Sequence, residues 1–172
     1  MKRRRKPPTG KGVMSVEVST AGLAAQSEKM QLVAIAVRDL VFLERPCDGP
    51  VSVDELRRSG VLDEHELEVG ATVGFPTAET VELRLNIRLV PKGELKPFEV
   101  KLGISGLFRK APDQRNRDAV AILGLIGGPL LFPFAREVIM NTLARTIFGP
   151  IGIQPLRLGA LFSDGDLAKI QD

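Results

Sequence analysis

The spacing of apolar residues changes along this chain, and the change separates a strand-forming part from a helix-forming part. Apolar and polar residues alternate over 67–75, 81–89 and 98–104, which gives each predicted strand one apolar face. The β-branched run 31–46 is typical of a further strand before them. Beyond residue 118 the apolar spacing becomes three or four, the period of a helix. We predict an α+β fold in which a four-stranded antiparallel sheet is covered by a long C-terminal amphipathic helix.

The first predicted strand carries one acid whose position has two interpretations. Strict alternation puts Asp39 on the same face as Val37 and Val41, so that a predominantly apolar face carries a charge. Such an acid could belong to a functional surface. A β-bulge or register change near Asp39 would instead turn it to the other face, and both interpretations stay open here.

A long connection joins the first strand to the second. Residues 46–64 are rich in turn-forming residues, and their number favours a loop that crosses the sheet over a hairpin. Ser52 followed by Glu55 has the spacing of a capping box, which predicts a short helix over Val53–Arg58.

The helical part contains an apolar run that has to be tested as a membrane span. Residues 119–135 are an uncharged stretch of 17 residues, at the lower end of the spanning range of about 17 to 25. The sequence Gly-Gly-Pro at 127–129 interrupts it, and Pro133 removes a further backbone donor that a bilayer would leave uncompensated. We therefore predict two buried helices that separate at 127–129, the second of them amphipathic over 132–147.

Composition and charge limit the classes of function. The chain has 172 residues, 44% apolar and 26% charged, as expected for one globular domain with a core. Six cationic side chains lie within residues 2–11, and without them the formal charge of +3 becomes about −3. We treat residues 1–28 as a basic, disordered tail and residues 29–172 as a single domain. No apolar signal-peptide segment follows the basic run, and the single cysteine excludes an intrachain disulfide, so we expect a cytoplasmic protein.

Residue patterns typical of catalysis or metal binding are missing from the sequence. His65 is the only histidine, and it lies in an acidic run without a second imidazole or a nearby cysteine. A Ser or Cys nucleophile paired with His65 stays open, but neither Ser105 nor Cys47 stands in a recognisable nucleophile motif. We predict no enzymatic activity, no metal and no cofactor.

Apolar residues near loops are the most distinctive feature of the C-terminal part. Residues 130–134, 148–153 and 156–162 are rich in Phe, Leu and Ile, and a four-stranded sheet with its helices leaves a surplus of them. This surplus indicates an oligomer interface or a surface for apolar partners. Ordinary core packing remains the simplest interpretation of any single one of these residues.

Residues 131–137 read LFPFARE, and they resemble a motif of the SecB family of bacterial protein-export chaperones, usually LFPYARE, at the start of the family's long helix. Downstream, GIQPL and GALF resemble the family's segment ending in LAPVNFDALF, and upstream FEV and GISG resemble its last strand. Asp39 with Phe42 fits its first strand. The similarity covers about residues 31–162 in the same order.

The resemblance implies a sheet-and-helix protomer that pairs sheet to sheet and assembles through its helices into a homo-tetramer, a dimer of dimers. It implies a holdase that binds unfolded preproteins without nucleotide and hands them to the motor SecA. The implied client groove lies between the crossing loop 46–64 and the helix 132–148. Its implied client-binding residues are Val51, Val53, Leu56, Val61, Phe132 and Phe148.

A second implied site is the outer face of the sheet, where the family docks the zinc-binding tail of SecA on an acidic patch. Asp39 and Glu99 match two of the acids, and Glu99 lies on the polar side of its predicted strand. Leu43 occupies the place of the third acid, with Glu44 one residue along.

Two other functions stay open. The chain could be a solitary SecB-like chaperone that protects a dedicated partner such as an antitoxin. It could instead be a binding module that uses its basic tail on nucleic acid or anionic lipid, without stable insertion into a membrane. Salt-sensitive nucleic-acid binding that disappears with residues 1–12 would identify the last of these functions.

Overall fold

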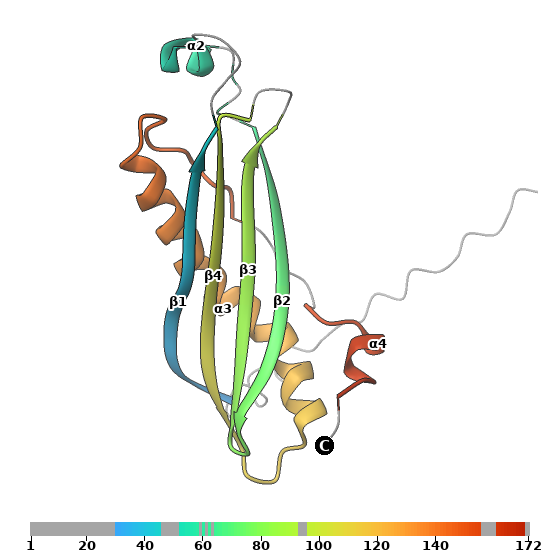
Figure 1. Ribbon diagram of the computed structural model, residues 1–172. Helices are drawn as coiled ribbons and strands as arrows, with labels where there is room; N and C mark the ends of the chain where they lie inside the picture. The colour runs from blue at the N-terminus through green and yellow to red at the C-terminus, as the bar shows by residue number, and fades with distance from the viewer. Residues whose placement is uncertain are drawn as a thin grey trace, which may run out of the picture.

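The computed structural model describes residues 30–45, 52–58, 60, 62, 64–92, 96–155 and 161–170. These residues form an antiparallel sheet with a long helix lying across one of its faces (Figure 1). The predicted basic tail, residues 1–28, lies outside the described residues. The predicted α+β fold class is confirmed.

Four strands and three helices make up the described chain. Their bounds are β1 Met30–Glu44, α2 Val53–Arg58, β2 His65–Thr77, β3 Thr80–Pro91, β4 Phe98–Lys110, α3 Asn116–Ala144 and α4 Asp164–Leu167. The strand order across the sheet is β1-β4-β3-β2, and all neighbouring strands are antiparallel. Because β1 and β2 are the two edges, the connection between them crosses the sheet as predicted. The predicted helix over Val53–Arg58 is present as α2, and Ser52 and Glu55 form its capping box.

Alternation along the strands places the core on the side of the sheet that faces α3. Side chains of the two central strands are fully buried there: Val81, Leu83, Leu85, Ile87, Leu89, Val100, Leu102 and Ile104. The helix contributes Leu123, Leu131, Ala135, Ile139 and Leu143 to the same cluster. Each such aliphatic side chain larger than alanine contributes about 1.5–3 kcal/mol when it leaves water. The layer of helix on sheet therefore follows directly from the alternating pattern.

Helix α3 corrects the prediction of two helices that separate at residues 127–129. It is one helix of 29 residues, with Pro129 and Pro133 inside it, both exposed on the side away from the sheet. A Cβ atom at Gly127 would lie 2.2 Å from Cδ2 of Leu83, so this glycine allows the helix to approach β3 closely. Packing of the buried face outweighs the backbone hydrogen bonds that the prolines remove. The Gly-Gly-Pro sequence therefore contributes a packing contact, and no helix boundary lies there.

Among the described residues, α3 is the helix long and apolar enough to cross a membrane by length and composition. The core helix of a soluble protein passes the same test, and 56% of the most apolar window of α3 is buried inside the protein. Packing on the sheet accounts for this hydrophobicity.

Strand β1 decides between the two interpretations of Asp39. Its register against β4 shifts twice, once before Ala34 and once before Asp39, and each shift exchanges the two faces of the strand. Asp39 lies opposite Gly103 on the outer face, whereas Ile35 and Phe42 pack against the core. The β-bulge interpretation is confirmed, because the bulge separates Asp39 from Val37, and Asp39 shares the outer face with the exposed Val41 and Leu43.

Candidate functional site

Four aromatic rings meet at the end of the sheet where β1 ends and β2 and β4 begin. The ring centroid of Phe98 lies 6.1 Å from that of Phe42, 5.1 Å from that of Phe148 and 6.5 Å from that of His65. Tilted and offset pairs of this kind contribute about 0.5–1.5 kcal/mol beyond their buried area. We call these four residues the aromatic cluster. Sequence reasoning missed it, although phenylalanines close to two strand ends were a signal that could have found it.

The chain that leaves α3 turns back and supplies the other side of this region; we call residues 148–155 the return segment. The turn is made at Gly149, whose φ of +74° favours glycine. A Cβ atom there would also lie 2.5 Å from the guanidinium of Arg57. Beyond the turn, the buried Ile151 and Ile153 alternate with exposed residues, so the segment is extended and presents one apolar side to the protein.

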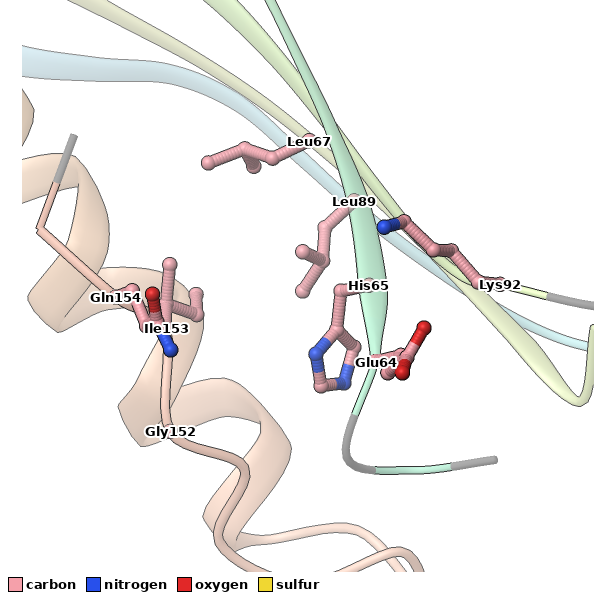
Figure 2. Close-up of a pocket in the computed structure, with 8 residues that line it drawn as sticks. All are labelled: Glu64, His65, Leu67, Leu89, Lys92, Gly152, Ile153 and Gln154. Atoms are coloured by element: carbon pink, nitrogen blue, oxygen red, sulfur yellow. The ribbon is translucent and has the colours of Figure 1, made fainter. Parts of the chain in front are cut away.

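Two clefts lie along the return segment, and both are lined by His65 and Gly152. The first, of about 300 Å³, separates the segment from the beginning of β2. Figure 2 shows Leu67, Leu89 and His65 pointing from the sheet toward the segment, with the Glu64 carboxylate turned away from it. The second cleft, of about 510 Å³, is also lined by Phe148 and by Arg57 of α2. We call the two adjoining clefts the groove.

The predicted client-binding residues are distributed over the core and the groove. Leu56, Phe132 and Phe148 are 3%, 5% and 4% exposed, and all three belong to the hydrophobic core. Phe148 lines the second cleft and belongs to the aromatic cluster, whereas Phe132 is not among the described residues that line either cleft. Val53 lies in α2. Val51 and Val61 lie outside the described residues.

Glu99 lies on the outer sheet face, as predicted, but its side chain is only 3% exposed. Arg88 donates to one carboxylate oxygen from Nε at 2.6 Å, Arg45 donates to the other oxygen, and Nζ of Lys101 lies 3.3 Å away. The hydrogen bond from Arg88, with those from Arg45 and Lys101, holds the pKa of Glu99 at about 2 although burial opposes the shift. Glu99 is therefore ionised at neutral pH and covered by three cations.

Asp39, the second predicted docking acid, is accessible. Its side chain is 47% exposed and forms an ion pair with Arg84, whose side chain is 40% exposed. Gly103 lies beneath the pair, because a Cβ there would lie 2.6 Å from Asp39 Oδ2 and 2.8 Å from Arg84 Nη2. An exposed pair contributes only about 0–1 kcal/mol, so another partner can replace Arg84 at little cost.

Comparison with known proteins assigns this chain to a family. The family model described as preprotein translocase subunit SecB matches residues 23–168. The chain belongs to the SecB family. Protein-export protein SecB of Rickettsia bellii is 32% identical over 130 residues, covering 73% of this chain and 80% of that protein. The protein of the same name from Acidithiobacillus ferrooxidans is 34% identical over 101 residues, covering 52% of this chain and 66% of that protein.

A solved structure shares the fold at low sequence identity. It is the SecB-like chaperone of Mycobacterium tuberculosis in complex with a ChAD peptide from the HigA1 antitoxin. The TM-score is 0.63 with 16% identity, over 77% of this chain and 94% of that one. Membership of the SecB family supports a chaperone role in protein export, and proteins of this family are soluble chaperones rather than enzymes.

Proposed function

We propose that this protein is an ATP-independent holdase that binds unfolded preproteins in the groove and delivers them to the Sec export machinery. Residues 29–172 act as one SecB-like domain, and the protein works in the cytoplasm. The observation that carries the proposal is the groove itself, which combines apolar side chains such as Leu67, Leu89 and Phe148 with a polar rim and lies beside an edge strand. The apolar side chains of the groove hold an extended, apolar client chain through many weak contacts. Such binding needs no recognition of a particular sequence and no covalent step.

Burial divides the proposed client site into two layers. The partly exposed Leu67 and His65 make the first contacts with a client at the open side of the first cleft. Leu56 of α2 and Phe148 at the second cleft are buried, and we propose that they support the groove from beneath. We assign Phe132 to the core, since it is a buried residue of α3 and is not among the described residues that line either cleft.

Exposed apolar side chains support the proposed homo-tetramer. The edge strand β1 exposes Val33, Val37, Leu40, Val41 and Leu43, each between 40% and 49%. An unpaired strand with such side chains is suited to pairing with the same strand of a second copy. Helix α3 exposes Leu130 and Phe134, by 43% and 48%, which would join two such dimers.

We propose that SecA docks on the outer sheet face, with Asp39 as the accessible acid and Glu99 as the covered one.

A specific observation also favours a second candidate, a chaperone for one dedicated partner. The three cations over Glu99 and the exposed, apolar Leu43 weaken an acidic docking face. The related fold from Mycobacterium tuberculosis, described with a peptide from an antitoxin, supports this candidate as well.

Sedimentation combined with a delayed-refolding assay tests the proposed function. The full chain, without nucleotide, should sediment as a tetramer and slow the refolding of a denatured client. A monomer that leaves refolding unchanged would contradict the holdase proposal. Asp39→Asn combined with Glu99→Gln should weaken SecA binding and spare client binding, whereas unchanged SecA affinity would favour the dedicated-partner function.

A further inference from the structure

The return segment forms one wall of the groove, yet it belongs to no helix and no strand. Among the backbone hydrogen bonds of the described residues, none joins residues 150–155 to β2. Burial of Ile151 and Ile153 holds the segment against the protein, but apolar contacts have no direction and leave its position along the groove undefined. A directional contact is needed to set the distance between this wall and β2.

Arg136 of α3 makes such a contact. Its Nε donates to the carbonyl oxygen of Ile153 at 2.6 Å, beside the first cleft. The other arginine contact with the segment is longer, 3.4 Å from Nη2 of Arg57 to the carbonyl oxygen of Phe148. A hydrogen bond from a charged donor is roughly twice as strong as a neutral one. The shorter bond therefore anchors the wall, and it does so from the rigid helix.

We infer that Arg136 is a positioning residue of the groove: by holding the Ile153 carbonyl, it keeps residues 152–154 opposite the beginning of β2 at a spacing that admits a client chain. The inference rests on the proposed holdase function. It adds a positioning role for Arg136, which a holdase could lack and still bind clients. Arg136 is not among the described residues that line either cleft, so it acts through the wall and not by touching the client.

Two substitutions separate the hydrogen bond from the charge. In Arg136→Gln the amide nitrogen stands at the same number of bonds from Cα as Nε of arginine, so a donor is kept and the charge is lost. Arg136→Met keeps the length of glutamine and has no donor. Arg145→Met is the matched control, because Arg145 is exposed at the end of the same helix and its side chain has no partner among the described residues.

Spin labels measure the position of the wall without any client. Labels are attached after Glu66→Cys and Gln154→Cys, two exposed positions on the two sides of the first cleft, in a Cys47→Ser background that removes the single native cysteine. Diluting labelled with unlabelled protein confines the signal to one chain. The distance distribution should be narrow in the parent protein, in Arg136→Gln and in Arg145→Met, and broad in Arg136→Met.

Client affinity is measured on the same variants without labels, with reduced and carboxymethylated lactalbumin as a permanently unfolded probe. Arg136→Met should weaken binding about tenfold, the scale of one charge-assisted hydrogen bond, and the other two variants should stay within about twofold. Equal distance distributions in all variants, or a broad distribution with unchanged affinity, would overturn the positioning role. Equal weakening by Arg136→Gln and Arg136→Met would overturn it too, in favour of charge. A parent protein that binds no unfolded probe would refute the holdase proposal and this inference with it.

Discussion

Replacing Gly127 by alanine should destabilise the protein, although alanine is the better helix former. The new Cβ would lie 2.2 Å from Cδ2 of Leu83, more than an ångström inside ordinary van der Waals contact. Leu83 is fully buried between helix and sheet, so its side chain has no free space to move into. Overpacking of this kind costs about 1–3 kcal/mol, whereas alanine gains about 1 kcal/mol over glycine inside a helix. We expect a net loss of about 1 kcal/mol in the free energy of unfolding.

The sign of the effect should reverse when Leu83 is shortened. Leu83→Ala removes Cδ2, the methyl group that the new Cβ would meet. Adding Gly127→Ala to the Leu83→Ala variant should therefore stabilise that variant by about 1 kcal/mol. Urea denaturation at one fixed protein concentration measures both steps, because assembly contributes to apparent stability.

Gly103→Ala is the matched control for Gly127→Ala. Its Cβ would also be too close, at 2.6 Å from Asp39 Oδ2, but the atoms it meets are the ends of exposed side chains that can move. We expect a change below about 0.5 kcal/mol. A neutral or stabilising Gly127→Ala in the parent protein would refute the close approach of α3 to β3.

Three further predictions concern the sites around the sheet. Glu99→Gln should remove a pH-dependent part of the stability: the folded pKa of about 2 lies below the ordinary 4.5, so this stabilisation is full above about pH 4.5 and is lost as the pH falls toward about 2. Unfolding midpoints at pH 7 and pH 3 test it, and an identical pH dependence in both proteins would exclude it. Phe98→Leu and Phe148→Leu, combined in a double-mutant cycle, should show a coupling of about 0.5–1.5 kcal/mol from rings 5.1 Å apart, where strict additivity would argue against the contact. Ser163→Ala should remove the cap whose Oγ accepts from the Asp166 amide and weaken α4 by about 1 kcal/mol, seen as faster hydrogen exchange at that amide; unchanged exchange would contradict the cap.

Local patterns were sufficient to predict the strands and the layer that covers them. Over 81–89 each apolar residue is followed by a polar one, and an extended chain with period two can bury such a set only on one face. The motif LFPFARE was specific enough to indicate the family before the fold was known. Both signals lie within a few consecutive residues, so they can be recognised from the sequence alone.

Contacts between distant segments could not be predicted in this way. The run 31–46 has apolar residues at both parities, so it fits two registers, and only pairing with β4 places Asp39 on the outer face. The Gly-Gly-Pro sequence is a helix breaker by propensity, and only the position of Leu83 makes a glycine at 127 necessary within a continuous helix.

The same limit applies to the candidate sites. Glu99 alternates with apolar neighbours and so was predicted on the polar face. The cations that cover it are Arg88 of β3, Lys101 of β4 and Arg45, one residue beyond the end of β1. The groove exists because the return segment, far along the chain from β2, is anchored beside it. The sequence by itself determined which apolar residues of the alternating strands β3 and β4 face the core, since that depends on local spacing. Only the tertiary structure decided which residues meet, because register and close approach depend on segments that the chain brings together from far apart.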